Sequence, residues 1–278
     1  MGGKPFTAYH QSLVEQAENQ ELSPETWFMP QLFCQLSPLP AANTGKNMFE
    51  RTNGNVTVTI WSKRGLPSGG LVRLLLAWLT TQAKWQKSPV LTIDTSQSQF
   101  LKSLGLSNSG RYAALLLEQV NRLARSTFQI ERVVGNGVEI ENVLVSRKAL
   151  ISMRPGKNSS WSSTIRLDEE FYQSILSNAV PVSAHAIKAL TKNPLAIDFY
   201  CWWNWRVHSM SRRKQIEIPL DALKLQFSSE TKERRDFRRK LENAAILASI
   251  FHHEIFNSTL FQSDKLIITK TNPHIAPK

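Results

Sequence analysis

The chain has 278 residues, which is enough for two modest domains with hydrophobic cores. Its 34 Lys and Arg residues outnumber its 22 Asp and Glu residues, and the net charge of +12 favours a polyanionic partner, nucleic acid before an anionic membrane surface. No apolar run reaches the roughly 20 residues of a membrane span, and the widely spaced Cys34 and Cys201 predict reduced, buried thiols in a cytoplasmic protein.

The first half of the sequence begins with a short polar helix, expected over residues 7–18, and a β-hairpin over residues 47–61. Asn53-Gly54 marks the hairpin because this pair accepts the positive φ angles of a type I′ turn. A helix over residues 71–86 follows, and its expected apolar face is made by Leu71, Leu74, Leu75, Trp78, Leu79 and Trp85. The next elements, in order, are a strand at residues 90–93, helices at 97–104 and 110–125, and a second hairpin at 127–145 around Gly135-Asn136-Gly137.

This order of elements is that of a winged helix-turn-helix: helix, strand, helix, tight turn, helix and hairpin. Each piece then buries a face that it could not bury alone. After it we expect an irregular basic stretch at 147–160, a strand at 161–167 and a helix at 168–177. Residues 179–182, which include Pro181, are the predicted boundary between two domains.

The second half repeats this order without significant sequence identity to the first. Asn193 is expected to cap a helix that starts at Pro194, because proline at the first helical position loses no hydrogen bond. A basic turn at 211–214 leads to a strand at 215–218, helices at 219–227 and 228–250, and strands at 253–261 and 266–270. We therefore predict a helix-rich α+β fold of two winged helix-turn-helix domains in tandem, at residues 28–180 and 181–278, after a polar segment at 1–27.

The helix expected at 228–250 has two faces at about 100° per residue. Its core-facing stripe comprises Phe237, Leu241, Ala244, Ala245 and Ala248. The opposite face is basic, and arginine forks suit phosphate oxygens and the edge of guanine. Because the last helix of a helix-turn-helix enters the major groove, we assign Arg235 and Arg239 to base edges. The residues that we assign mainly to phosphates are Ser228, Thr231, Lys232, Arg234 and Arg238.

Each of the remaining candidates has a competing structural interpretation. Arg234 and Arg238 can instead pair along the helix with Glu230, Glu233 or Glu242. The third helix of the first copy offers four side chains for which contact with the DNA backbone or with a protein is as plausible as base reading: Arg111, Asn121, Arg122 and Arg125. The basic stretch between the copies offers phosphate contacts or a merely solvated loop through Lys148, Arg154 and Lys157.

Catalysis has little support in the sequence. A glycine-rich phosphate loop is missing, and so are the Cys/His spacings of a zinc site and the His-x-His pair that a rolling-circle nickase needs for its metal. We therefore expect a protein that is not an enzyme and has no cofactor.

One stretch resembles a known family. GLPSGGLVRLLLAWLTTQAK at residues 65–84 is similar to the signature of plasmid-encoded RepA-type replication initiators. Further stretches agree in the right order, among them FMPQLFCQLSPLP, FERTNGNVTVTI, LLEQVNRLARSTFQI, KALTKNPLAIDFYCWWNWR and RRDFRRKL. The resemblance runs from about Phe28 to Ala276 and departs from the family pattern at Ser68 and Val72, where an aromatic residue and a proline are expected.

The resemblance implies a plasmid initiator with two winged-helix domains, the second of which reads the DNA sequence. Related initiators bind direct repeats, called iterons, in origin DNA. Dimers formed through the N-terminal domain repress the initiator's own gene and so affect plasmid copy control. Monomers bind the repeats, help to open the duplex and recruit host replication proteins, here the host initiator and the replicative helicase or its loader. No membrane partner is implied.

Two other functions fit the same pattern. A winged-helix transcriptional regulator without an initiator role is the first alternative, although two fused and dissimilar copies are unlike a symmetric dimeric repressor. A protein–protein scaffold whose charge is incidental is the second. The salt dependence of DNA binding separates a scaffold from the others, because each neutralised phosphate contributes about −0.9 to the slope of log K against log salt.

Overall fold

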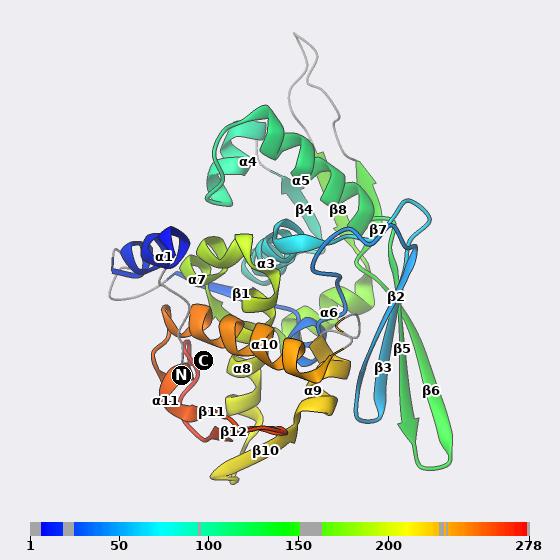
Figure 1. The fold of residues 1–278 in the computed structure, drawn as a ribbon. Helices are drawn as coiled ribbons and strands as arrows, with labels where there is room; N and C mark the ends of the chain where they lie inside the picture. The colour runs from blue at the N-terminus through cyan, green and yellow to red at the C-terminus, as the bar shows by residue number, and fades with distance from the viewer. Residues whose placement is uncertain are drawn as a thin grey trace.

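The structure is a computed structural model that describes residues 7–18, 25–93, 96–150, 163–227, 231 and 233–276. The chain folds into helices and antiparallel sheets (Figure 1). They are packed around one connected cluster of buried side chains that extends from Leu13 to Ile268. None of the described helices is both long and apolar enough to cross a membrane. Cys34 and Cys201 are buried and are not joined by a disulfide, as predicted.

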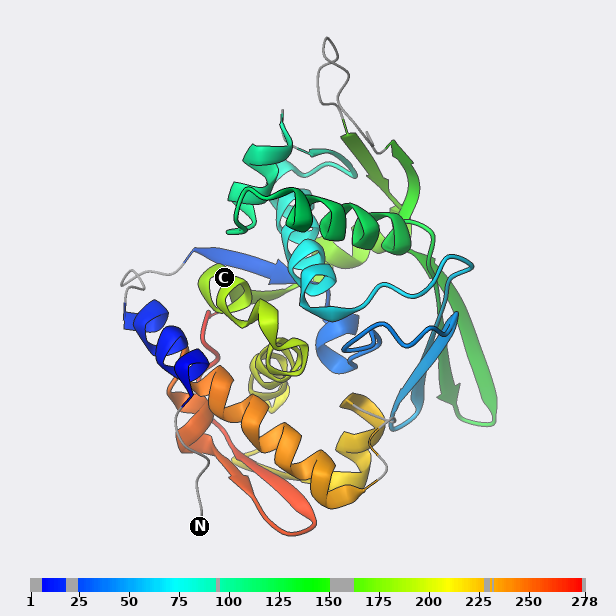
Figure 2. The same ribbon diagram turned by 45° about the horizontal axis from the view of Figure 1, so that its top comes forward.

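Helix α3, Gly69–Gln86, lies at the centre of the molecule (Figure 2). We expected one apolar face, but the helix is buried nearly all round because other elements cover every side of it. Trp85, predicted to face the core, is 52% exposed at the end of the helix. A Cβ at Gly70 would lie 1.8 Å from the carbonyl oxygen of Thr191, so only glycine allows this close approach. The elements that pack on α3 include α5 (Gly110–Leu123), α6 (Glu169–Asn178), α8 (Pro194–Ser209) and β1 (Thr26–Met29).

Both predicted hairpins form, and they join in one sheet. Its strand order is β2 (Met48–Asn53), β3 (Val56–Trp61), β5 (Thr127–Val134) and β6 (Gly137–Leu144). The hairpins meet where β3 pairs with β5, and Val58 and Ile60, opposite Ile130 and Phe128, are buried. The sheet projects at one side of the molecule with β6 at its edge (Figure 1).

The strand predicted at 90–93 forms and belongs to a separate three-stranded sheet. β4, Val90–Ile93, pairs with β8, Ser163–Leu167, which also pairs with β7, Ser146–Leu150. The prediction of an irregular stretch at 147–160 is therefore wrong for its first residues, and residues 151–162 lie outside the described part. α4 (Gln97–Ser103) and α5 begin where predicted, with Ser96 and Ser109 accepting hydrogen bonds from Gln99 N–H and Tyr112 N–H.

The C-terminal half has the predicted element order. Asn193 caps α8 by accepting a hydrogen bond from the Ala196 N–H, and Pro194 is its first residue. Then follow β10 (Gln215–Pro219), α9 (Leu220–Phe227), α10 (Arg234–Ser249), α11 (Glu254–Ser258), β11 (Thr259–Phe261) and β12 (Lys265–Thr269). The three strands form a sheet in the order β10-β12-β11. α10 crosses α8 and packs on it (Figure 1).

Two predictions in this half are wrong. The helix expected from residue 228 begins at Arg234, since Glu233 is extended at φ −83° and ψ 131°. The strand expected at 253–261 begins as helix α11. Its short apolar run fits either structure, and burial of Ile255 together with a hydrogen bond from the Ser258 hydroxyl to the Glu254 carbonyl favours a helical turn.

The predicted boundary at 179–182 is a strand. β9, Val180–Ser183, pairs with β1 in the antiparallel sense, so the start of the chain crosses to this point. The short helices α2 (Gln31–Gln35) and α7 (Ala184–Ala189) lie next to α8 and to the polar helix α1 (Ala8–Glu18), respectively. The division into domains at 180/181 stays a prediction, and the buried cluster continues across it.

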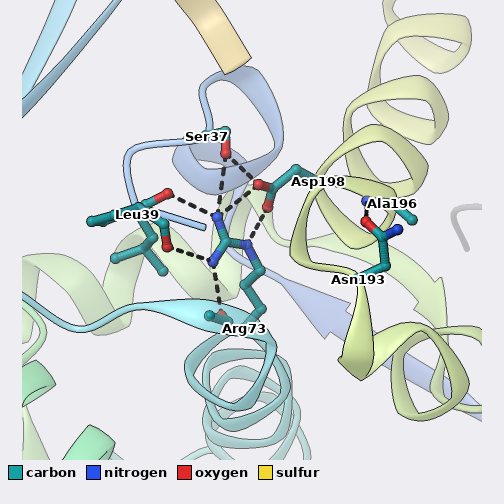
Figure 3. A network of polar contacts seen from close by, with 8 residues as sticks. Ser37, Leu39, Arg73, Asn193, Ala196 and Asp198 are labelled. Carbon is teal, nitrogen blue, oxygen red and sulfur yellow. Dashed lines mark hydrogen bonds and ion pairs between the residues drawn. The ribbon is translucent and has the colours of Figure 1, made fainter. Parts of the chain in front are cut away.

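A buried ion pair joins the two halves. Arg73 of α3 and Asp198 of α8 are 3% and 8% exposed, and their Nε and Oδ1 atoms lie 2.6 Å apart (Figure 3). The guanidinium also donates to the carbonyl oxygens of Leu39 and Gly69, each at 2.8 Å, and Asp198 accepts from the Ser37 hydroxyl. Buried charges need such a set of partners, because removal of either one leaves the other uncompensated.

Candidate nucleic-acid interface

The start of α10 concentrates positive charge on an exposed surface. Four arginines occupy its first two turns: Arg234, Arg235, Arg238 and Arg239. The predicted core-facing stripe is correct, because Phe237 and Leu241 are fully buried and Ala244, Ala245 and Ala248 are also buried. The arginines lie at the N-terminal end of the helix, where the helix dipole also favours anions.

Arg235 and Arg239 face away from the core, as predicted. Arg235 is exposed, and within the described residues no hydrogen bond or ion pair restrains it. The side chain of Arg239 is 66% exposed and lies 3.3 Å from the Asp236 carboxylate in an exposed i,i+3 pair, which is worth little in water. Arg239 and Lys240 also line a hollow of about 550 Å³ between α10 and residues 37–41. Both guanidinium groups are therefore accessible to a ligand.

Arg234 and Arg238 are engaged in contacts within the protein. Arg234 forms a two-pronged pair with Asp221 of α9, with 3.0 Å between Nε and Oδ1, which lowers the pKa of that carboxyl group. Arg238 pairs with Glu242 at 2.9 Å, as the alternative interpretation predicted, and contacts the carbonyl oxygen of Phe261. Arg234 thus ties α9 to α10, and Arg238 ties α10 to β11.

The other C-terminal candidates differ from expectation. Thr231 is 9% exposed and its hydroxyl lies 3.3 Å from Lys240 Nζ, so little of this residue is open to a ligand, although it lines the same hollow as Arg239. Ser228 and Lys232 lie outside the described residues. Lys240 was not among the predicted candidates, although it is exposed and lies next to Arg239. In the sequence, the one indication for Lys240 is its position directly after Arg239, which was predicted to face away from the core.

Of the four candidates on and just after α5, Arg122 and Asn121 make contacts within the protein, whereas Arg111 and Arg125 are exposed. The Arg122 side chain is 15% exposed, and it donates to the Leu66 carbonyl oxygen at 3.1 Å and pairs with Glu118. Asn121 donates to the Leu117 carbonyl oxygen and accepts from Arg125 at 2.6 Å. Arg111 is exposed at the first turn, and Arg125 is exposed despite its bond to Asn121.

The candidates between the two copies are only partly described. Lys148 is exposed on β7. Arg154 and Lys157 lie outside the described residues. The exposed cations of α5, of the turn after it and of β7 are therefore Arg111, Arg125, Arg147 and Lys148. Of these, Arg147 pairs with Asp168 at 3.1 Å.

Comparisons with known proteins agree with the resemblance in the sequence. The family model described as plasmid encoded RepA protein matches residues 66–219, which is more than half of the chain. Crystal structures of domains 2 and 3 of RctB are similar in fold. One has a TM-score of 0.57 and 12% identity, covering 87% of this chain and 98% of that one. The other has a TM-score of 0.54 and 12% identity, covering 86% and 96%.

No curated protein matches the sequence. The likeness to RctB concerns the fold alone, because 12% identity carries no information on individual side chains. The family match covers α3 to β10 and so includes α5, the Arg73–Asp198 pair and the helix α8 on which α10 packs. The chain belongs to the family of plasmid-encoded RepA proteins, the replication-initiator family whose motifs it resembles.

Proposed function

We propose that the protein is a plasmid replication initiator that binds double-stranded origin DNA through α10. The observation that carries this proposal is the pair of accessible guanidinium groups of Arg235 and Arg239, on the face of α10 opposite a fully buried Phe237. Family membership and the net charge of +12 support it. Arginine in this position can form bidentate hydrogen bonds to guanine, while neighbouring cations neutralise phosphates.

The C-terminal half supports the assignment of a winged helix. α9 and α10 follow each other as a helix-turn-helix, and the sheet β10-β12-β11 places the β11–β12 hairpin beside α10. We propose that α10 enters the major groove and that this hairpin acts as the wing. For the N-terminal half we propose a divergent winged helix, because the element order is the same although β4 pairs with β8.

The molecular role follows from the family. We propose that the protein binds iterons, helps to open the origin, recruits the host initiator and the replicative helicase or its loader, and represses its own gene. This role requires neither catalysis nor a cofactor, and it places the protein in the bacterial cytoplasm.

Self-association through the N-terminal half is part of this proposal. β6 is an edge strand, and the hairpin that it forms with β5 exposes four apolar side chains to more than half: Val133, Val134, Val138 and Ile140. Exposed apolar edge strands pair readily with a second chain. We propose that β6 contributes to a homodimer.

Two measurements test the proposed function. A labelled repeat from the origin of the protein's own replicon is expected to bind more tightly than scrambled DNA at about 150 mM salt. Equal binding of the two duplexes contradicts sequence-specific recognition. A replicon that lacks its initiator gene is expected to be maintained when the protein is supplied in trans, and failure to maintain it with intact DNA binding favours the transcriptional regulator.

A further inference from the structure

A hollow at the end of α8 gathers arginines that the DNA-binding proposal does not use. It has a volume of about 410 Å³ and lies at the turn between α8 and β10. Three arginines line it, together with Ser209, Met210, Ser211 and Ile216: Arg206, Arg212 and Arg213. Ser211 adopts a left-handed φ of 50°, its carbonyl oxygen accepts a bond from Lys270 Nζ, and the Arg213 N–H donates to the Met210 carbonyl oxygen at 2.9 Å. The turn is therefore held in place by its own contacts.

This hollow continues into a larger groove of about 920 Å³, since both are lined by Ser209 and Ser211. The groove lies between the end of α3, the end of α6, strands β1 and β9, the last turns of α8 and residues 273–276. Its apolar lining includes Phe28, Trp85, Pro181, Trp205, Pro273 and Ile275. The site thus combines an apolar half with a basic half.

The charge of the combined site is one-sided. Lys84 and His208 line the large groove and three arginines line the hollow, whereas the described lining of both contains no Asp or Glu. Arg206 Nε is buried and has no hydrogen-bond partner among the described residues. Burial and the nearby charge of Arg213 lower the pKa of Arg206. An anionic ligand on the exposed Arg213 would offset this like-charge repulsion.

The aromatic side chains favour a peptide over a single-stranded nucleic acid. Single strands bind by stacking successive bases on free aromatic faces. Here the Arg206 guanidinium lies 4.6 Å from the centre of the Trp205 ring, and Lys84 Nζ lies 5.1 Å from that of Phe28. Among the aromatic rings that line the groove, Trp85 is largely exposed, at 52%. One free ring beside proline and isoleucine suits an apolar side chain better than a run of bases.

The site is separate from the proposed duplex-binding surface. β10 leads from the turn at Gln215 to Pro219, where α9 begins and Asp221 holds Arg234. These four residue steps span about 13 Å, at about 3.3 Å per residue in a strand. The arginine hollow lies at the end of the sheet away from the N-terminus of α10, so both surfaces can be occupied together.

We propose that this groove docks an acidic segment of a partner protein, with carboxylates on Arg212 and Arg213 and an apolar side chain against Trp85. The carboxylates and the apolar side chain of the segment then contact one continuous surface. The proposal says where, and through which chemistry, the protein would contact a host replication protein. Only the identity of the partner as a replication protein rests on the proposed function. Duplex binding through α10 does not depend on this groove and is tested separately.

Fluorescence anisotropy with a labelled short peptide tests the proposal, the probe having Asp and Glu residues on both sides of a Leu-Phe pair. We expect Arg212→Ala/Arg213→Ala to weaken its binding roughly tenfold, as two exposed ion pairs of about 0.7 kcal/mol each would. Trp85→Ala is expected to weaken binding without changing its salt dependence, because it removes an apolar contact. Both changes are at exposed side chains, so the fold should persist, and Lys102→Ala is a matched control on α4.

Three outcomes overturn the proposal. In the first, the peptide binds no better than a counterpart with Lys in place of Asp and Glu. In the second, the groove variants bind the peptide like wild type. In the third, the variants lose an oligothymidine but not the peptide, which would make the groove a single-strand surface. Binding of duplex origin DNA is measured in parallel and is expected to be unchanged by Arg212→Ala/Arg213→Ala, so failure of this proposal and failure of the proposed function are distinguishable.

Discussion

Helices α5 and α10 occupy the same place in the element order of the two halves, yet their arginines make different contacts. In α5, Arg122 is mostly buried and holds the Leu66 carbonyl oxygen, whereas in α10 Arg235 and Arg239 extend from the protein. By count, α10 carries five cations and α5 carries two, but a count does not show which of them are accessible. Accessibility depends on the partners that each guanidinium finds in the fold, and these partners favour α10 over α5 as the proposed DNA-binding helix.

The largest expected effect tests the two faces of α10. Phe237→Ala should destabilise the protein by roughly 3–5 kcal/mol, because the ring is fully buried and its loss leaves a cavity. Urea denaturation measures this change. Phe256→Ala is the matched control, since that ring is 66% exposed and should change stability by no more than about 0.5 kcal/mol. Equal stability of the two variants would mean that the faces of α10 are misassigned.

The next effect concerns the support beneath α10. His274 stacks on His252 with 4.6 Å between ring centroids, and its Nδ1 is hydrogen-bonded to the Tyr200 hydroxyl at 2.7 Å. Burial and His252 lower the pKa of His274 to about 4. The unfolded chain takes up this proton near pH 6.5, so it binds more protons than the folded protein between about pH 6.5 and 4. Stability should therefore fall by roughly 3 kcal/mol as the pH decreases through that window.

The matched variant for this prediction is His274→Asn, which keeps a hydrogen-bonding group for Tyr200 and removes the titration. Urea denaturation at several pH values should give a flatter profile for the variant than for wild type between pH 6.5 and 4. Identical profiles would show that His274 does not resist protonation in the folded state.

A smaller effect isolates DNA binding from folding. Arg239→Ala should weaken binding of the origin repeat by about 1–3 kcal/mol if the side chain reads a base, while the melting temperature stays near that of wild type. Competition against scrambled duplex shows whether the loss is specific. A loss of the same size on both duplexes would move Arg239 from base reading to phosphate contact.

The smallest expected effect is a loss of folding stability without a loss of DNA affinity, and it concerns Arg122 of α5. Arg122→Ala should cost about 1 kcal/mol of folding stability, because it removes the bonds to Leu66 and Glu118. DNA affinity of the folded variant should be unchanged. A variant that folds normally but loses DNA affinity would show that α5 also reads DNA and that the contrast between the two helices is wrong.

Local patterns predicted much of the fold. The Asn-Gly and Gly-Asn-Gly turns placed both hairpins, Asn193-Pro194 placed the start of α8, and the apolar stripe of α10 identified its buried face. These features are determined by residues close in sequence. The pairing of β1 with β9, the burial of α3 on all sides and the burial of Arg73 against Asp198 depend on contacts across more than 100 residues or on several elements, which local periodicity does not encode.

The residues of the candidate site divide in the same way, into those whose orientation follows from nearby sequence and those whose contacts depend on distant elements. The outward direction of Arg235 and Arg239 followed from helical periodicity, since it needs only the position of the buried stripe. The engagement of Arg234 by Asp221 and of Arg122 by Leu66 depends on where α9 and residues 65–66 fold. Charge pattern alone therefore overestimates the number of arginines that are available to DNA.

The most direct test compares specific and scrambled duplexes for wild type and Arg235→Ala/Arg239→Ala across a salt series. The account predicts that wild type prefers the origin repeat, and that the double variant loses this preference while its fold and its response to urea are unchanged. Retention of the full preference by the double variant would contradict the assignment of sequence reading to α10.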